Sequence, residues 1–320
     1  MSVNIEIAAL EADAAALTEA GRAQPSLANG LALWRNVRAL DLESEEPLGL
    51  RFHMLAQIGL RDGEALRHIW APSRTAAEIG DYIDRQERAA RDMAPVSDAD
   101  LAMMIAGLQG RDNDSPLDRE LAKDFCAAGG QRRAGLCAVM ERMISHGFAW
   151  AGSLSEARLL FSLLTRAALQ AGSGPPMGLP MGRVPGAFLD RNWHLERSAE
   201  AREQDILLWL PFMKQEAQFV RESLRIFGRQ LQATRAALKR DRRGRASALL
   251  EHLCLRPFMT SVEASRYLRE AGKPETPMAD IRNLLLRLAA TGIIEEHGNS
   301  RYNRCFVARR YLDLLEMERF

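Results

Sequence analysis

Apolar residues recur at helical spacing through most of the first 236 positions. Between residues 30 and 42 the apolar residues are three or four positions apart, which places them on one face of a helix. They are Leu31, Trp34, Val37 and Leu40. A longer stripe predicts a helix over residues 205–238 that is kinked or restarted at Pro211. No strand-like alternation occurs before Gly292, so the pattern predicts an all-α body.

Helix-start and helix-breaking residues refine this pattern. Ser115 precedes Pro116, and Asp118 lies three residues after the serine, which predicts a helix with a serine N-cap and proline at its first position. Residues 172–186 hold nine Gly or Pro among fifteen and predict an irregular loop. A phosphate-cradling role for this loop is the sharper alternative, but the GxxxxGK[ST] pattern and a preceding strand are both missing.

Three short helices are predicted near the C-terminus. The first covers residues 246–256. Thr260 and Glu263 form a capping box that opens the second, with Val262, Ala264 and Leu268 expected to point inward. Thr276 as N-cap, followed by proline at the first helical position, predicts a third helix over residues 278–290.

Two strands are predicted after these helices. Residues 293–296 and 304–307 have strand composition, a turn-rich segment separates them, and a last helix is expected over residues 308–318. The predicted fold is therefore mainly α. An all-α body covers residues 1–236, a basic hinge covers 237–245, and a winged helix-turn-helix domain with a short β-hairpin covers 246–320.

The third helix of this predicted domain has two chemically different faces. Helical spacing turns four residues inward: Ile281, Leu284, Leu285 and Leu288. It turns Ala279, Arg282, Asn283 and Arg287 outward. Arginine matches the major-groove edge of guanine and asparagine that of adenine, so Arg282 and Asn283 are candidate base readers. Leu286 lies near the outer face, where it would pack on a partner protein if not on DNA.

Charge is unevenly distributed along the chain. The 320 residues hold 43 Lys and Arg and 42 Asp and Glu, of which residues 237–320 hold 16 and 11. A basic C-terminal part on an acidic body favours a contact with nucleic acid, although a solvated basic surface is the plainer explanation. Phosphate contacts are expected from the hinge, from Thr276 at the third helix and from the hairpin. These additional candidates are Arg240, Arg242, Arg243, Arg245, Thr276, Arg301 and Arg304.

Double-stranded DNA is therefore the expected partner, and a homodimer is the expected assembly because one recognition helix reads few bases. The alternatives are a winged helix that docks on another protein and one that only braces its neighbour. Acidic Asp280, Glu295 and Glu296 close to the predicted DNA face favour protein docking.

The C-terminal stretch also carries a family resemblance. It has a leucine-rich third helix, a Thr-Gly-Ile exit, then Arg-Tyr-Asn-Arg at 301–304 and Ala-Arg-Arg-Tyr-Leu-Asp at 308–313. Residues 256–316, about a fifth of the chain, resemble the winged-helix module that follows the catalytic domain in many Fic-domain (filamentation-type) adenylyltransferases. The resemblance implies a Fic-like helical body upstream, with the signature HPFxxGNGRxxR.

The best upstream match to that signature begins at His146. His-x-Phe is present, and Arg158 enters an apolar helix, but Gly-Asn-Gly-Arg is absent and Gly152 is the only glycine left after Phe148. We therefore expect a Fic-like body that has lost catalysis. The enzyme hypothesis is a divergent nucleotidyl or phosphoryl transferase with His146 as base and Arg158 on phosphate. Otherwise His146 is a helix C-terminal histidine that meets the helix dipole favourably.

Other chemistry is not indicated by the sequence. The four cysteines and the remaining histidines lack metal-ligand spacing, and no dinucleotide or hydrolase motif occurs, so we expect no metal and no cofactor. The sequence has no long uncharged apolar run and no basic N-terminal leader, and cytoplasmic location is the resulting expectation. The working hypothesis is a DNA-binding transcription regulator whose helical body serves assembly or sensing.

Overall fold

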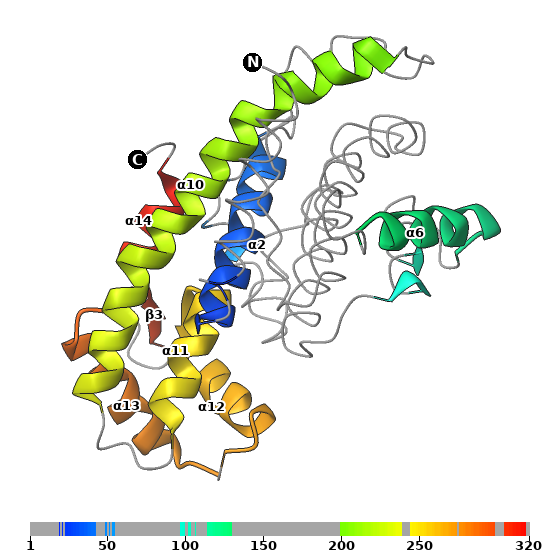
Figure 1. Ribbon diagram of the computed structural model, residues 1–320. Coiled ribbons are helices and arrows are strands. Elements are labelled where there is room, and N and C mark those ends of the chain that lie inside the picture. The colour runs from blue at the N-terminus through cyan, green and yellow to red at the C-terminus, as the bar shows by residue number, and fades with distance from the viewer. Residues whose placement is uncertain are drawn as a thin grey trace. The chain divides into compact units, whose positions relative to one another are not determined.

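A computed structural model describes about half of the chain (Figure 1). The described residues are 23–42, 114–129, 199–238, 244–273, 275–297 and 304–317, with positions 19, 21, 49, 51, 53, 54, 97–99, 102, 103 and 106. These residues are mainly helical, with one three-stranded antiparallel sheet. The chain divides into two compact units, Met1–Pro47 with Asp81–Arg221 and Leu48–Gly80 with Glu222–Phe320. They are called unit 1 and unit 2 below.

Unit 1 contains helix α2 (Pro25–Leu42), which begins five residues before its predicted start and buries the predicted Leu31, Trp34 and Val37. Its Arg35 Nε donates to the carboxylate of Glu216 at 3.0 Å, and the guanidinium lies 4.1 Å from the ring centroid of Phe219. Both partners belong to helix α10 (Ala199–Ala237). A buried charge requires such a partner, so this contact fixes α2 against the first part of α10.

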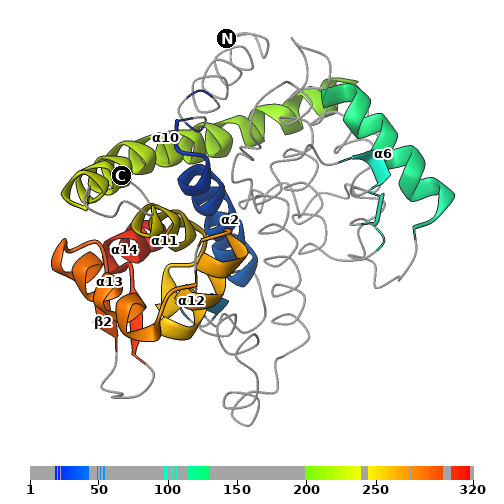
Figure 2. The ribbon, with the colours of Figure 1, turned by 90° about the horizontal axis from the view of Figure 1, so that it is seen from below.

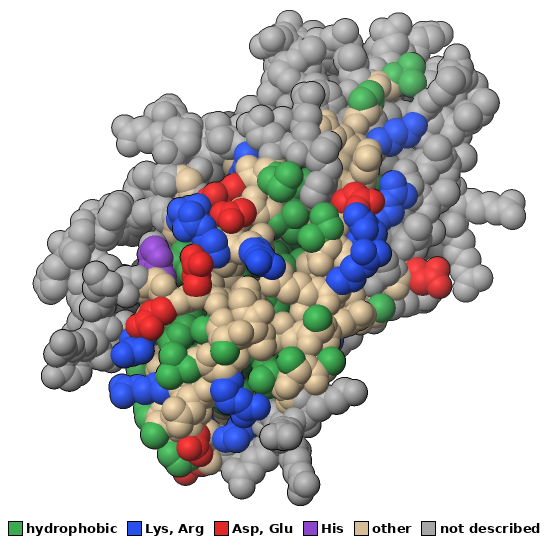
Figure 3. All heavy atoms as spheres, turned by 90° about the vertical axis from the view of Figure 1, so that its left-hand side faces the viewer, with side chains coloured by type: hydrophobic (Ala, Val, Ile, Leu, Met, Phe, Trp, Pro, Cys, Tyr) green, Lys and Arg blue, Asp and Glu red, His purple; other side chains and the backbone are tan. Residues whose placement is uncertain are grey.

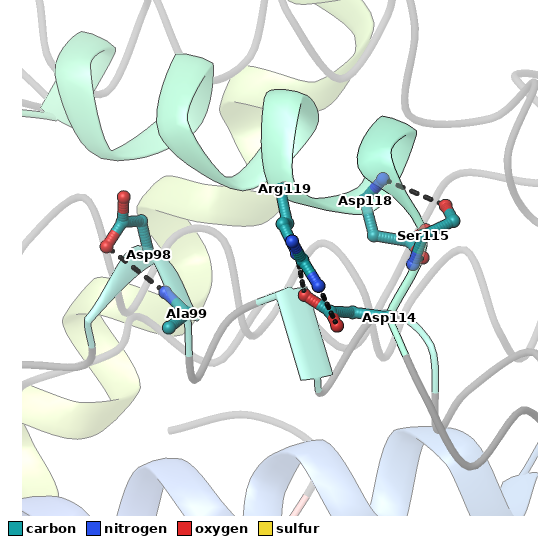
Figure 4. A network of polar contacts seen from close by, with 6 residues as sticks. All are labelled: Asp98, Ala99, Asp114, Ser115, Asp118 and Arg119. Carbon is teal, nitrogen blue, oxygen red and sulfur yellow. Dashed lines mark hydrogen bonds and ion pairs between the residues drawn. The ribbon is translucent and has the colours of Figure 1, made fainter.

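Helix α6 (Pro116–Gly129), also in unit 1, begins where the sequence predicts. Ser115 Oγ accepts from Asp118 N at 3.2 Å, and Asp118 Oδ2 accepts from Ser115 N at 2.6 Å (Figure 4). The predicted serine N-cap is therefore confirmed, and Asp118 makes the cap reciprocal. Arg119 adds a two-pronged exposed ion pair with Asp114.

Helix α10 runs without a break through Pro211, whose side chain is exposed. The helix therefore does not restart at this position, and the alternative, a kink at Pro211, stays a prediction. Proline removes one backbone hydrogen bond. The buried residues that follow it, such as Ala217 and Val220, provide packing that offsets this local cost.

Unit 2 contains the last part of α10 followed by seven short elements in chain order. These are α11 (Arg245–Leu255), β1 (Phe258–Thr260), α12 (Ser261–Glu270), α13 (Met278–Ala290), β2 (Glu295–His297), β3 (Cys305–Val307) and α14 (Arg309–Glu316). The strand order is β1-β3-β2, with Phe258 and Glu295 both opposite Val307. Figure 2 shows the four short helices gathered beside the end of α10.

The core of unit 2 joins α10 to the C-terminal elements. The rings of Phe227 and Tyr311 stack with centroids 4.7 Å apart, and Tyr311 Oη donates to the carbonyl of Cys254 at 3.1 Å. Both aromatic side chains are buried to 2% exposure or less. Three helices, α10, α11 and α14, therefore meet at Tyr311.

The described elements differ from the predicted ones in four places. Strand β1 was not predicted, because three residues after a helix carry no readable alternation. Strand β2 starts two residues late, because its pairing with β3 begins at Glu295. Val262 is 44% exposed and not inward, because it stands at the solvent side of the first turn of α12. The N-cap of α13 is Pro277, so the predicted cap at Thr276 is wrong by one residue.

None of the helices that the structure describes combines the length and the apolar composition that a membrane span requires.

Candidate nucleic-acid interface

Helix α13 has the two faces that the sequence predicts. Ile281, Leu284, Leu285 and Leu288 are at most 4% exposed. Ala279, Arg282, Asn283 and Arg287 are all exposed. The structure therefore brings four candidate contact residues together on one solvent-facing helix surface, which we call the α13 face.

The α13 face carries charge at its flanks. On a helix of 3.6 residues per turn, Asn283 lies opposite the buried leucines, while Arg282 and Arg287 fall on either side of it. Within the described part of the chain, neither arginine forms an ion pair. Both guanidinium groups are thus available to an anionic ligand. Asp280, also exposed, lies in the first turn, where a carboxylate stabilises the helix dipole.

The C-terminal end of α13 is held firmly. Thr291 Oγ1 donates to the carbonyl of Leu288 at 2.7 Å, and Gly292 takes φ +73°, a conformation that glycine adopts without strain. Gln230 of α10 donates through Nε2 to the carbonyl of Gly292 at 3.2 Å. The helix end is therefore tied to α10 by a contact that sequence spacing did not reveal.

The start of α12 is anchored by a buried network. Thr260 Oγ1 accepts from Glu263 N at 3.2 Å, and Glu263 Oε2 accepts from Thr260 N at 3.4 Å, so the predicted capping box is confirmed. The other carboxylate oxygen of Glu263 accepts from Arg256 Nη1 at 3.3 Å. The side chains of Arg256 and Glu263 are only 3% and 4% exposed. This buried network stabilises the turn before α12, and α12 in turn packs against α13.

Thr276 lies just ahead of α13 and is half-buried. The backbone carbonyl of Pro277 accepts from Asp280 N and Ile281 N at 2.9 and 3.1 Å, and Pro277, the N-cap residue, supplies no side-chain cap. The N–H groups at a helix start are a suitable partner for a phosphate. A phosphate contact at Thr276 remains a prediction.

The β2–β3 hairpin has a mixed character. Arg304 Nη1 lies 3.2 Å from Glu296 Oε2, an ion pair between the two strands with both side chains exposed. Glu295 and His297 are exposed beside it. A phosphate would have to compete with Glu296 for Arg304, so this arginine is a weaker candidate than the sequence indicates. Arg301 lies outside the described residues.

The predicted basic hinge is described only at its ends. Helix α10 ends at Ala237, and Arg245 is the first residue of α11, half-buried after Gly244 with φ +64°. Arg240, Arg242 and Arg243 lie outside the described residues, as do His146 and Arg158 and the glycine-rich segment 172–186. The roles expected for those residues stay predictions.

Charge on the surface is interspersed. On the side of the molecule in Figure 3, basic and acidic side chains of the described residues alternate with apolar ones and form no wide field of one sign. A broad field would attract any polyanion from a distance. On this side, recognition would depend on particular side chains.

Two thiols and one buried phenol among the described residues have raised pKa values. Burial raises the pKa of Cys254 to about 12 and that of Cys305 to about 11, and it raises the pKa of Tyr311 well above 10. All three groups are protonated near neutral pH, which is unsuited to a thiolate nucleophile. No cluster of three His, Cys, Asp or Glu that could hold a metal occurs among the described residues.

No known protein family and no curated protein matches the chain.

Proposed function

We propose that the C-terminal part of this protein is a winged helix-turn-helix that binds double-stranded DNA, and that the protein acts as a transcription regulator. The order α11, β1, α12, α13, β2, β3 and the strand order β1-β3-β2 support this arrangement. In a helix-turn-helix, the second helix of the pair, here α13, enters the major groove. The all-α body then serves assembly or sensing, and the active form is a homodimer with one α13 for each half-site.

The observation that carries the proposal is the α13 face. Two arginines without ion-pair partners in the described chain flank an exposed asparagine, on a helix whose other side is fully buried. Arg282, Asn283 and Arg287 are the side-chain types that hydrogen-bond guanine and adenine in the major groove. The contacts of Gln230 and of the Arg256–Glu263 pair hold the helices in place, so a ligand would meet a preorganised surface.

The test is binding of the full-length protein to DNA selected from a random pool, followed by Arg282→Ala and Asn283→Ala. Each variant is expected to lose about 1–3 kcal/mol on the selected site. Arg119→Ala is the matched control, because Arg119 is exposed and already paired with Asp114 in unit 1. Wild-type affinity in both α13 variants would show that α13 is not the reading helix.

A second candidate function is docking on another protein. Met278 and Leu286 of α13 and Val262 of α12 are 39–44% exposed, so both helices present apolar side chains that a partner protein could cover. Binding to a protein that is insensitive to salt, together with no binding to DNA, would favour this function over the first. Electrostatic DNA binding falls steeply with salt, so the salt response separates the two.

A further inference from the structure

One large apolar residue lies on the α13 face. Leu286 is 44% exposed, as several other large apolar side chains of the described residues are, but it alone of them lies between the candidate base-contacting residues of α13. Helical spacing places it on one line with Ala279, Asn283 and Ala290, opposite the buried residues of α13. The outermost line of the helix is thus apolar except for a single amide.

The charge around this line favours DNA as its occupant. Arg282 and Arg287 lie on the two flanks of the line and complement the phosphates that border a groove. In the major groove, the C5 methyl group of thymine is the apolar feature of the base edges, and adenine presents the N6 and N7 pair that an asparagine side chain matches. An outer line of leucine and asparagine between arginines therefore corresponds to A·T base pairs between phosphate chains.

We infer that Leu286 contacts the methyl group of a thymine in the major groove, beside an adenine that Asn283 reads. This inference rests on the proposed DNA-binding function and names the bases that the α13 face selects. Residues three apart on a helix have Cβ atoms about 5–6 Å from each other, so Asn283 and Leu286 reach the same or the neighbouring base pair. Leu286 is then a specificity-determining residue.

The experiment uses full-length protein and a duplex selected from a random pool. Each thymine is replaced in turn by deoxyuracil, which removes only the methyl group, and affinity is measured by fluorescence anisotropy for the wild type, Leu286→Ala and Ile226→Ala. Ile226 of α10 is the matched control, because it is equally exposed at 44%. Circular dichroism checks that the variants are folded.

We expect one uracil position to weaken wild-type binding about fourfold, which equals ~0.8 kcal/mol, the worth of one buried methyl-sized group. Leu286→Ala should bind the thymine duplex about fourfold or more weakly and should no longer distinguish uracil from thymine at that position. Ile226→Ala should keep the wild-type preference.

Two outcomes would overturn the inference, and they are distinguishable. Specific DNA binding with no uracil-sensitive position that depends on Leu286 would reject the thymine contact and leave the proposed function standing. No DNA binding by the wild type at low salt would reject the proposed function itself, and the thymine contact with it, and would leave Leu286 as a contact for a partner protein.

Discussion

At the scale of single residues, burial decides which groups take part in chemistry. Cys254 is fully buried, its Sγ donates to the carbonyl of Leu250 at 3.2 Å, and its pKa is raised to about 12, first by desolvation and secondarily by Glu251, against the lowering effect of Arg235. The thiol therefore acts as a small apolar side chain that packs within α11.

This burial predicts an alkaline loss of stability. The unfolded thiol ionises near pH 9 and the folded one near 12, so folding holds the proton. The contribution is complete below pH 9 and is lost progressively as pH rises toward 12. Between pH 8 and 10.5 the free energy of unfolding should fall by about 2 kcal/mol more in the wild type than in Cys254→Ala, measured by urea denaturation. Equal falls in both proteins would contradict this assignment.

At the scale of secondary-structure elements, local signals and tertiary contacts contribute separately. The starts of α6 and α12 are predictable because Ser115 and Thr260 cap them through side chains close in sequence. The start of α13 is not predictable in the same way, because the cap falls on Pro277. Strand β1 forms only because β3, more than forty residues later, pairs with it, and no short-range pattern encodes that pairing.

The two threonines therefore make a matched test of capping. Thr260→Ala removes the acceptor for Glu263 N and is expected to lower the free energy of unfolding by about 1 kcal/mol. Thr276→Ala is expected to cost less than half of that, because Thr276 lies one residue ahead of the N-cap position of α13, which Pro277 occupies. Chemical denaturation of the full-length variants measures both. Equal losses would contradict the claim that the Thr260 cap stabilises α12 more than Thr276 stabilises α13.

The candidate site could be predicted from the sequence only in part. The buried and exposed sides of α13 follow from helical spacing, so Arg282, Asn283 and Arg287 were identifiable from the sequence. The contact that anchors the end of α13 could not be predicted, because Gln230 and Gly292 are 62 residues apart in the sequence. The pairing of Arg304 with Glu296 across the hairpin was also missed, although opposite charges flanking a predicted turn are a usable signal for it.

At the scale of the whole molecule, unit 2 is larger than the C-terminal 75 residues that the sequence singles out. The last part of α10 contributes Phe227 to its core. An early segment also belongs to it: Arg51 holds Glu316 through two hydrogen bonds of 3.1 Å, with Asp313 at 4.0 Å, and His53 and Met54 are buried. No local pattern near residue 51 indicates a partner 265 positions away.

Neighbouring residues of α10 test this larger core. Phe227→Ala removes the ring that stacks on Tyr311 and is expected to cost about 3–5 kcal/mol in the free energy of unfolding. Ile226→Ala, at a position 44% exposed, should change stability by about 0.5 kcal/mol or less. Urea denaturation compares the two. A similar small effect from both would mean that residues 246–320 are stable without α10.

The central claim is that the C-terminal part binds duplex DNA through α13. Its most direct test is fluorescence anisotropy of the full-length protein with mixed genomic DNA fragments at several salt concentrations. The account predicts micromolar or tighter binding that weakens steeply as salt rises, and a further loss in Arg282→Ala but not in Arg119→Ala. Absence of binding at low salt, or binding that ignores Arg282 altogether, would contradict it.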